Sequence, residues 1–304
     1  MQESPTSIAL LNPCAGGGRA GSGAARWRRK LPRGCKVIEC QTREETETEA
    51  QAAAERGEGT IIAIGGDGTI HHAANGVLRA SHSSSALAVM PSGTANDYWA
   101  TLRNYAAQAA GGEVCVDVGE VRQGNFRRFF VNAMGIGFSA ETAAAAQEYR
   151  RWPPRLRYLL GVLTSLRHRW SLTRARIQLD DREPSEVELL LLSIAKGRRE
   201  GSFTLAPEAQ LDDARLQILT AAGLRRRDVA RYLPGVCFGR LPTRDPRICF
   251  ETGRTLSIAP ARPLRFHLDG ELYGESFLPS AEETEVVLHP RRLRVRFLDC
   301  NTRQ

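Results

Sequence analysis

Short apolar runs alternate with longer helical stretches through the first third of the chain. Runs rich in Ile, Leu, Val and Ala predict strands at residues 8–11, 36–40, 60–64 and 86–90. The stretches between them predict helices at 23–30, 44–56 and 70–79. Alternating strands and helices indicate crossover connections on a mostly parallel sheet. Such a sheet binds ligands beyond the carboxyl ends of its strands.

The pattern changes after an apolar run at 114–121. Two helical stretches follow, at 139–149 and 155–169, and then short strand-like segments at 174–179, 187–194, 215–220, 255–258, 264–268 and 284–288. Strands without helices between them indicate an antiparallel sandwich or barrel. We therefore predict an α/β domain over residues 1–122 and a β-rich domain over 123–290, with 291–304 able to rejoin the first.

The composition indicates a folded cytoplasmic protein. Of the 304 residues, 42% are hydrophobic and 25% charged, which is ordinary globular usage. The longest apolar run, 187–195, is too short and too polar to span a membrane, and the acidic amino terminus is unlike a secretory signal. The seven cysteines include no CxxC pair, which argues against a disulfide framework and a zinc site.

The 42 basic residues outnumber the 34 acidic residues, which gives a net charge of +8. The basic residues are 39 arginines and only three lysines, Lys30, Lys36 and Lys196. A basic protein can bind nucleic acid, phosphorylated ligands or an anionic membrane surface, and the charge alone does not choose among them. Because no nucleic-acid-binding motif is present, we predict no nucleic-acid partner.

Three glycine-rich loops follow the first, third and fourth predicted strands, so they should meet at one sheet edge. They are Asn12–Arg19 (NPCAGGGR), Gly65–Thr69 (GGDGT) and Pro91–Asp97 (PSGTAND). Glycines let backbone amides approach phosphates closely, and helix amino termini add positive potential. Asp67 would repel a triphosphate unless it holds Mg²⁺. No GxxxxGK[ST] motif occurs, which excludes a P-loop.

A second interpretation of the first loop is a dinucleotide site. Gly16, Gly18 and Gly21 satisfy GxGxxG between a predicted strand and a helix, and Glu39 ends the next strand where such folds place a ribose-binding acid. A nicotinamide oxidoreductase therefore stays open, although it explains neither Asp67 nor the fourth-strand loop.

Five motifs together resemble the diacylglycerol kinase catalytic family, and most of all its bacterial soluble lipid kinases. They are NPCAG at 12–16, GGDGT at 65–69, PSGTAND at 91–97, NAMGIG at 132–137 and LDGE at 268–271. The resemblance implies a nucleotide-binding α/β domain followed by a β-rich domain, with the active site in the cleft between them. It also implies an ATP- and Mg²⁺-dependent kinase that phosphorylates diacylglycerol or a related membrane lipid.

The resemblance also implies site residues. ATP would contact the first loop and the GGDGT loop, with Thr42 and Thr94 nearby: Asn12, Pro13, Cys14, Ala15, Gly16, Thr42, Gly65, Gly66, Asp67, Gly68, Thr69 and Thr94. Asp67 would be the acid linked to the catalytic metal. Glu271 would accept the proton of the lipid hydroxyl, with Asp269 beside it on the same face if the strand continues. Without the other motifs, two acids around Gly270 would indicate a hairpin turn.

A further stretch, 207–216, resembles the family's structural Mg²⁺ loop. The implied ligands are the Asp213 side chain and the carbonyls of Gln210 and Arg215. Ala214 stands where the family usually has glycine, which disfavours the site if this position needs a positive φ.

His71 and His72 also depart from the family, which commonly has Asn and Glu at these positions. A neutral histidine cannot supply the charge of a glutamate, so metal or substrate contacts could differ. The alternative is a pair of half-exposed histidines on the first turn of a helix.

Residues 150–170 combine six arginines with Trp152, Tyr158 and several leucines. This pattern is typical of a helix lying on an anionic bilayer, which would place the enzyme transiently at the inner face of the membrane. The alternative is a helix that packs Leu159, Leu163 and Leu166 onto the second domain. A sphingoid-base or other lipid-alcohol kinase, a non-catalytic nucleotide sensor and a homodimer all stay open.

Overall fold

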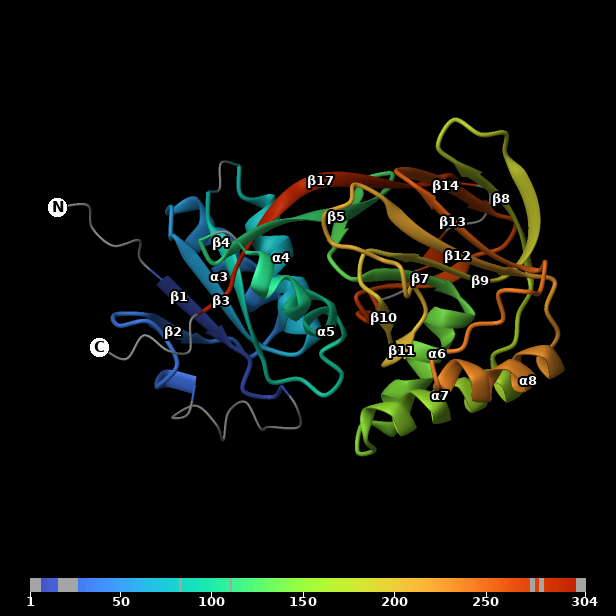
Figure 1. Cartoon of the computed structure of the whole chain (residues 1–304), viewed down its shortest axis with the longest axis horizontal. Coiled ribbons are helices and arrows are strands. Elements are labelled where there is room, and N and C mark those ends of the chain that lie inside the picture. The colour runs from blue at the N-terminus through green and yellow to red at the C-terminus, as the bar shows by residue number, and fades with distance from the viewer. Residues whose placement is uncertain are drawn as a thin grey trace. The chain divides into compact units, whose positions relative to one another are not determined.

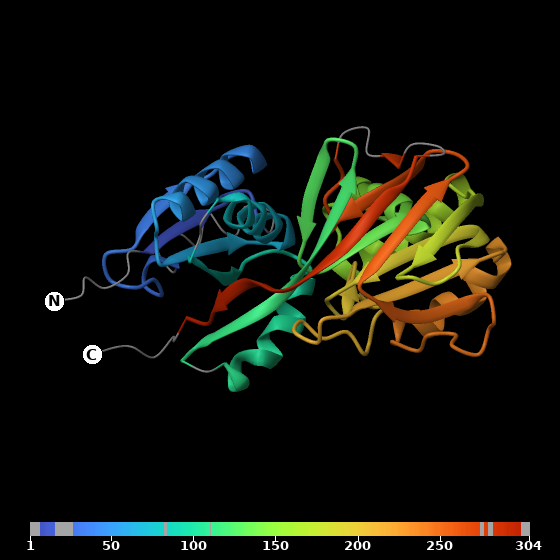
Figure 2. The same ribbon diagram turned by 90° about the horizontal axis from the view of Figure 1, so that it is seen from above.

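The computed structural model describes residues 7–15, 27–81, 84–109, 111–273, 277–278 and 282–298. Contacts divide the chain into two compact units. The first comprises Met1–Asp117 with Pro290–Gln304, and the second Val118–His289. The chain leaves the first unit within strand β5 (Glu113–Gln123) and returns within β17 (Thr284–Arg296), as Figure 2 shows. The predicted boundaries near 122 and 291 fall in these two strands.

The first unit is a parallel α/β layer structure. Its elements are β1 (Ser7–Leu11), β2 (Lys36–Glu39), α3 (Arg43–Glu55), β3 (Thr60–Gly65), α4 (Asp67–Arg79), β4 (Ala86–Pro91), α5 (Asp97–Leu102) and the 3₁₀ helix η1 (Arg103–Gln108). The strands lie in the order β2–β1–β3–β4–β17, and every neighbouring pair is parallel. The predicted crossover arrangement is therefore confirmed (Figure 1).

Alternating side chains of these strands pack on both faces of the sheet. Helices α3 and α4 lie side by side against one face (Figure 2). On the other face Ala9, Leu11, Ile62, Ile64 and Met90 form a buried cluster. Burial on both faces explains why β3 has no exposed residue. The first half of the predicted helix at 23–30 lies outside the described residues, and residues 27–28 are helical.

Charged side chains join β5 to β17 where both strands belong to the first unit. Glu113 of β5 accepts hydrogen bonds from Arg294 Nη2 at 2.6 Å and from Arg296 Nε at 2.7 Å. Partial burial raises the pKa of Glu113, but the bonds and charges of the two arginines outweigh it, so the pKa lies below its usual range. Asp117 Oδ1 accepts the N–H of Arg291 at 2.8 Å, where φ is 49° just after Pro290.

The second unit is mainly antiparallel. Its strands are β6 (Phe126–Phe130), β7 (Ala133–Gly137), β8 (Thr173–Leu179), β9 (Ser185–Ala195), β10 (Arg199–Glu200), β11 (Phe203–Thr204), β12 (Leu216–Ala222), β13 (Ile248–Gly253), β14 (Thr255–Pro260), β15 (Leu264–Leu268) and β16 (Phe277–Leu278). Strand β9 is the branch point, because its first half pairs with β8 and its second half with β7 and β12.

The second unit has two hydrophobic cores. The strands enclose the first, and the second lies between the strands and the helices. Strand residues such as Phe130, Ile136 and Ile194 belong to the enclosed cluster. The helices of this unit are α6 (Phe138–Ala146), the 3₁₀ helix η2 (Gln147–Tyr149), α7 (Pro154–His168) and α8 (Arg226–Cys237). Val162 of α7 packs with Leu219 of β12 in a second cluster, which α8 also contacts (Figure 1).

Candidate active site

The glycine loops of the first unit meet at the carboxyl ends of its parallel strands. Asn12 Nδ2, after β1, lies 3.4 Å from Thr69 Oγ1 on the first turn of α4. The N–H groups of Ser92 and Gly93, after β4, donate to the carbonyl of Gly65 at 2.7 and 3.1 Å. The structure therefore brings together all three predicted loops.

Two glycines make this meeting sterically feasible. A Cβ on Gly66 would lie 3.0 Å from the Cα of Gly93, and a Cβ on Gly93 would lie 2.3 Å from the Cα of Gly66. Any side chain at either position would therefore push the second and third loops apart. The amino terminus of α4 begins at Gly66, which has no side chain to cap it. A helix amino terminus of this kind carries positive potential, which favours an anion.

Asp67 contacts the neighbouring helix. Its Oδ1 accepts the N–H of Tyr98 at 3.1 Å, which fixes the first turn of α5 against α4. Asp97, adjacent to Tyr98 in the chain, adds a second, buried carboxylate to this end of α5. Sequence reasoning included Asp97 in the PSGTAND motif but assigned it no role.

The other predicted nucleotide contacts lie on or beside these loops. Cys14 is exposed, and its N–H donates to Asn12 Oδ1 at 3.0 Å in a turn that includes Pro13 and Ala15. Thr42 caps α3: its hydroxyl accepts the N–H of Glu45 at 3.1 Å. Thr94 is exposed on its loop, and Gly68 belongs to the first turn of α4. Gly16 and the other glycines of the GxGxxG pattern lie outside the described residues.

The interpretation of His71 and His72 as half-exposed is wrong. Both are buried, and their rings pack edge to face with centroids 5.0 Å apart. His72 Nδ1 lies 3.5 Å from Glu47 Oε2 on α3, and Arg79 donates to the other oxygen of Glu47 at 2.7 Å. Because α3 and α4 pack tightly, position 72 faces a helix interface in this chain.

The turn that carries Glu271 belongs to the second unit. Strand β15 ends at Leu268, and Asp269 and Gly270 have φ values of 53° and 85°. Leu268 and Glu271 exchange two backbone hydrogen bonds, 2.8 and 3.0 Å long. This is the geometry of a two-residue hairpin turn with positive φ at both central residues. The strand does not continue through Asp269, so the condition for both carboxylates to share a strand face is not met, and the alternative of a hairpin turn around Gly270 is confirmed.

The carboxylate of Asp269 is directed at the backbone. It is buried and accepts three N–H groups, from Val131 at 3.1 Å, Asn132 at 2.8 Å and Ala133 at 3.0 Å. A carboxylate with this many amide donors fixes the start of β7 and the turn together. Glu271 is only half-buried.

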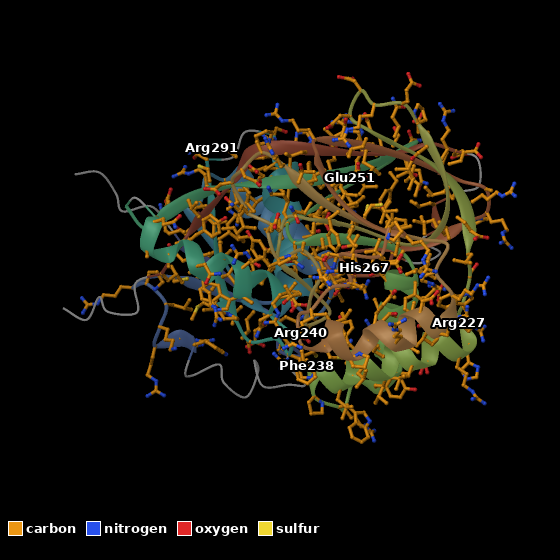
Figure 3. The ribbon with its side chains drawn as sticks, turned by 45° about the vertical axis from the view of Figure 1, so that its right-hand side comes forward. Arg227, Phe238, Arg240, Glu251, His267 and Arg291 are labelled. Carbon is orange, nitrogen blue, oxygen red and sulfur yellow. The ribbon has the colours of Figure 1, made fainter. Side chains whose placement is uncertain are left out.

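Sequence reasoning missed a buried polar network beneath this turn. The Nδ1 atom of His267 accepts the N–H of Gly270 at 3.2 Å, so Nε2 carries the ring proton and points to Glu200 Oε1 at 3.1 Å. Ser139 and Ser193 also donate to Glu200. Burial raises the pKa of Glu200, but the hydrogen bonds from His267 and the two serines outweigh it, so the pKa is lowered. Figure 3 labels His267 in this region.

The predicted magnesium loop contacts an ammonium group. Lys196, directly after β9, is completely buried, and its Nζ donates to Asp213 Oδ1 at 2.7 Å and to the carbonyl of Arg215 at 2.8 Å. These are two of the three predicted metal ligands. Ala214 between them has a φ of 56°. Gln210 is exposed.

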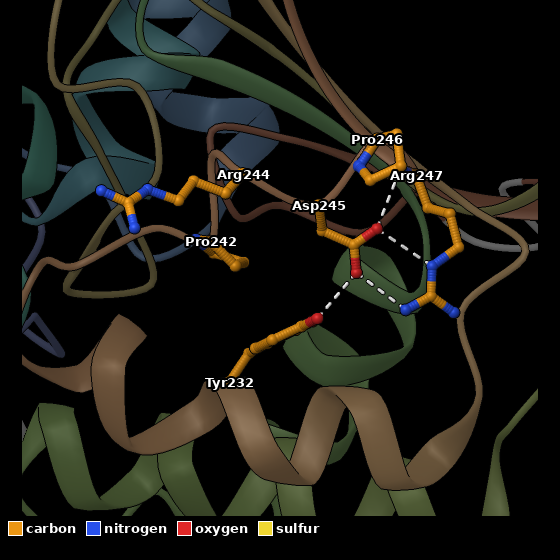
Figure 4. Close-up of a pocket in the computed structure, with 6 residues that line it drawn as sticks. All are labelled: Tyr232, Pro242, Arg244, Asp245, Pro246 and Arg247. Carbon is orange, nitrogen blue, oxygen red and sulfur yellow. Dashed lines mark hydrogen bonds and ion pairs between the residues drawn. The ribbon is translucent and has the colours of Figure 1, made fainter.

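A pocket of about 490 Å³ lies elsewhere in the second unit, lined by residues from 232 to 247 (Figure 4). Three of its polar side chains bind one another: Asp245 accepts Tyr232 Oη at 2.6 Å and Arg247 Nη2 at 2.7 Å. Arg247 and Tyr232 hold the pKa of Asp245 well below its usual range. The network anchors α8 to the segment before β13, and none of the predicted site residues lines the pocket.

The residues at the glycine loops fit a nucleotide and its metal. Glycine at 66 and 93 lets the backbones of two loops meet at the amino terminus of α4, where an anion is favoured, and Asp67 offers an oxygen donor of the type that Mg²⁺ prefers. Within the part of the chain that the structure describes, no cluster of three His, Cys, Asp or Glu side chains could hold a metal by itself. A metal here would therefore share its ligands with phosphate oxygens and water.

Comparisons with known proteins agree with the two-unit division. Residues 6–128 match the family model of the diacylglycerol kinase catalytic domain, and residues 132–296 match that of the YegS C-terminal NAD kinase beta sandwich-like domain. These matches confirm the predicted resemblance and fold class. The predicted location of the active site between the domains stays a prediction.

Individual relatives are distant. A diacylglycerol kinase of Staphylococcus saprophyticus is 22% identical over 251 residues, which cover 79% of this chain and 80% of the relative. A protein of Enterobacter sp. strain 638 named "Probable lipid kinase YegS-like" is 29% identical over 276 residues, 82% of each chain. A solved diacylglycerol kinase structure from Bacillus anthracis, 18% identical, covers 98% of each chain with a TM-score of 0.69, which shows the fold.

Proposed function

Because the chain belongs to the diacylglycerol kinase catalytic family, we propose that it transfers the γ-phosphoryl group of ATP to a hydroxyl of diacylglycerol or a related membrane lipid. The observation that carries this proposal is the meeting of three glycine loops at the uncapped amino terminus of α4. Phosphoryl transfer depends mainly on positioning and on neutralising phosphate charge, and this arrangement supplies both.

In this proposal the first unit binds the nucleotide. The amino terminus of α4 would bind phosphate oxygens, and Asn12 would orient them from the first loop. Asp67 would hold Mg²⁺, which when bound draws charge from the phosphates. The hydrogen bond from Tyr98 keeps the Asp67 carboxylate in one orientation.

The second unit would supply the base. Glu271 accepts the proton of the lipid hydroxyl as the new P–O bond forms, and the ADP leaving group takes the electron pair of the breaking bond. A general base must be held in place to be effective, and this turn is held at two points. Asp269 binds the start of β7, and His267 binds the N–H of Gly270. A Cβ atom built on Gly270 would lie 3.8 Å from the hydroxyl oxygen of Tyr158 on α7.

The same proposal includes a peripheral contact with the lipid surface. No helix among the described residues has the length and apolar character of a membrane span. Three large apolar side chains are nevertheless exposed on or beside α7 and α8: Trp152 at 52%, Leu163 at 47% and Phe238 at 84%. Figure 3 labels Phe238. Exposed arginines such as Arg155 and Arg167 accompany them. Aromatic side chains beside cations suit an anionic interface.

The packing of α7 agrees with only part of the alternative interpretation. Leu166 is partly buried in the cluster that α7 forms with the strands, where Val162 is the buried apolar residue of α7, but Leu163 is exposed. Cosedimentation with anionic and with zwitterionic vesicles tests the contact. We expect wild-type protein to bind anionic vesicles and Phe238→Ser with Trp152→Ser to weaken that binding. Equal binding of both proteins would refute the contact.

Phosphate transfer from γ-labelled ATP tests the activity directly. Mixed vesicles carry diacylglycerol, phosphatidylglycerol, sphingosine or ceramide in turn, and the products are separated by chromatography. Label in diacylglycerol that is absent with Glu271→Gln supports the proposal. Label in sphingosine alone would identify a sphingoid-base kinase. Measurable ATP binding without label in any lipid would refute a kinase acting on these four lipids.

A further inference from the structure

We propose that the buried ammonium group of Lys196 takes the place of the structural metal ion in the loop 210–215, so that this chain needs no Mg²⁺ there. The loop offers Asp213 and the carbonyl of Arg215 as oxygen ligands, and Lys196 already donates to both. This inference concerns the folding of the second unit and does not depend on the proposed activity.

The distances are those of hydrogen bonds to an ammonium. Nζ lies 2.7 Å from Asp213 Oδ1 and 2.8 Å from the Arg215 carbonyl, as expected for charge-assisted bonds. Mg²⁺ requires six oxygens at about 2.0–2.1 Å. A Mg²⁺ ion on either oxygen would lie no more than about 5 Å from Nζ, which is the sum of the two bond lengths. Two like charges so close in a buried place repel strongly, so the ammonium and the metal exclude each other.

The surroundings of Lys196 show a built site. Its side chain has 0% exposure, whereas that of Asp213 retains 27%. Asp213 Oδ1 also accepts the N–H of Arg215 at 3.1 Å, which closes the loop over the ammonium. Burial of a lysine is costly unless it is paired and hydrogen-bonded, and here it is both.

The ammonium does what a structural cation would do. It ties the end of β9 to the start of β12, because Lys196 follows Ala195 and Arg215 precedes Leu216. The backbone N–H groups of Lys196 and Gly197 both donate to the carbonyl of Asn132 at 2.8 Å. The N–H of Asn132 in turn donates to Asp269. The site is therefore continuous with the backbone that supports the Glu271 turn.

The backbone at Ala214 adopts a conformation that favours glycine. An alanine at φ 56° is strained, and glycine would relieve the strain. The loop keeps this conformation with alanine because the ammonium and the Asp213 side chain hold both of its ends.

Thermal unfolding of nucleotide-free protein tests the proposal, in EDTA and in rising MgCl₂ at an ionic strength held constant with NaCl. We expect the Tm of the wild type to be the same in EDTA and at every MgCl₂ concentration. Lys196→Met should lower the Tm by roughly 6–12 °C, because it leaves a carboxylate without its cation, and added Mg²⁺ should not restore it. Lys196→Ala, which vacates the space, should regain stability with Mg²⁺. Lys36→Ala, at an exposed lysine, is the matched control.

The wild-type arm decides the matter even if the Lys196 variants fail to fold. A saturable rise of the wild-type Tm with Mg²⁺ that is lost in Asp213→Asn would overturn the proposal, because it would show a metal bound at this loop. An unchanged wild-type Tm supports the proposal, together with equilibrium dialysis of nucleotide-free protein in which the wild type binds no more Mn²⁺ than Asp213→Asn does.

Discussion

The two carboxylates of the Asp269–Glu271 turn should fail in different ways when each is neutralised. Asp269→Asn keeps the shape of the side chain but replaces one acceptor oxygen with an NH₂ group. That group would face the N–H of Val131, so one hydrogen bond is lost and two donors oppose each other. The bonds from Asn132 and Ala133 remain but lose their charge.

The magnitude follows from the three bonds. A hydrogen bond to a charged group contributes about 1.5–3 kcal/mol and a neutral one about 0.5–1.5 kcal/mol. Losing one bond and weakening two, offset by the smaller cost of burying a neutral amide, gives a net loss of about 3 kcal/mol. For a unit of this size that corresponds to a fall in Tm of roughly 6–12 °C.

Glu271→Gln should give the opposite pattern. The side chain is half-buried, and the turn is closed by backbone bonds that the substitution leaves in place. We expect a wild-type Tm and a fall in kcat of about 100-fold or more, since general-base catalysis contributes at least this much. Calorimetry and the vesicle assay measure the two quantities on the same samples.

One result would refute this division of roles. If Asp269→Asn unfolds at the wild-type temperature while losing turnover as completely as Glu271→Gln, then Asp269 acts on the substrate and its three backbone bonds are incidental. If Glu271→Gln retains wild-type turnover, Glu271 is not the base.

Three further predictions concern other parts of the chain. ATP should protect the exposed thiol of Cys14 from alkylation but leave Cys249, also exposed, reactive, as peptide mass mapping would show; equal labelling would place the nucleotide elsewhere. Because the pKa of Glu113 is lowered in the folded state, its ion pairs stabilise the first unit above about pH 4.3 and are lost as pH falls through the lowered value. Glu113→Gln should therefore destabilise the protein at neutral pH, by an amount that shrinks in acid unfolding titrations. His267→Leu should lower kcat about 10- to 100-fold with little change in KM for ATP, whereas His267→Asn, which keeps an acceptor for Gly270, should recover part of the loss.

The sequence predicted the first unit well because its strands are buried on both faces. A strand such as β3 reads as a continuous apolar run, and glycines mark where it ends. Helix α8 was not predicted, because it contains Pro234, begins with arginines and has no buried residue. Strand β17 was predicted only over residues 284–288, because Pro290 interrupts the pattern, yet the strand resumes beyond the bend at Arg291 and pairs with β4.

The candidate site was predictable where chemistry and local pattern coincide. The three glycine loops follow from strand order alone, since parallel strands end at one edge. The strand before Asp269 was predicted with its correct end at residue 268, and the hairpin around Gly270 was foreseen as the alternative to a continuing strand. The network of His267 and Glu200 joins positions 67 residues apart, and only the tertiary structure brings them together. His72 was misjudged because the packing of α3 on α4 does not show in a single helix.

The position of Lys196 could have been noticed from composition. In a chain with 39 arginines and three lysines, a lysine directly after a run of buried apolar residues is unusual. The physical chemistry explains the choice of residue. An arginine brings five N–H donors in a rigid plane, all of which must be satisfied when buried, whereas an ammonium is a compact charge with three donors on a flexible stem. A site formed by one carboxylate oxygen and one carbonyl at 2.7 and 2.8 Å has the size and the acceptors for the ammonium. Ala214, which stands where the family's metal loop usually has glycine, thus lies beside a cation that the chain itself supplies, the ammonium group of Lys196.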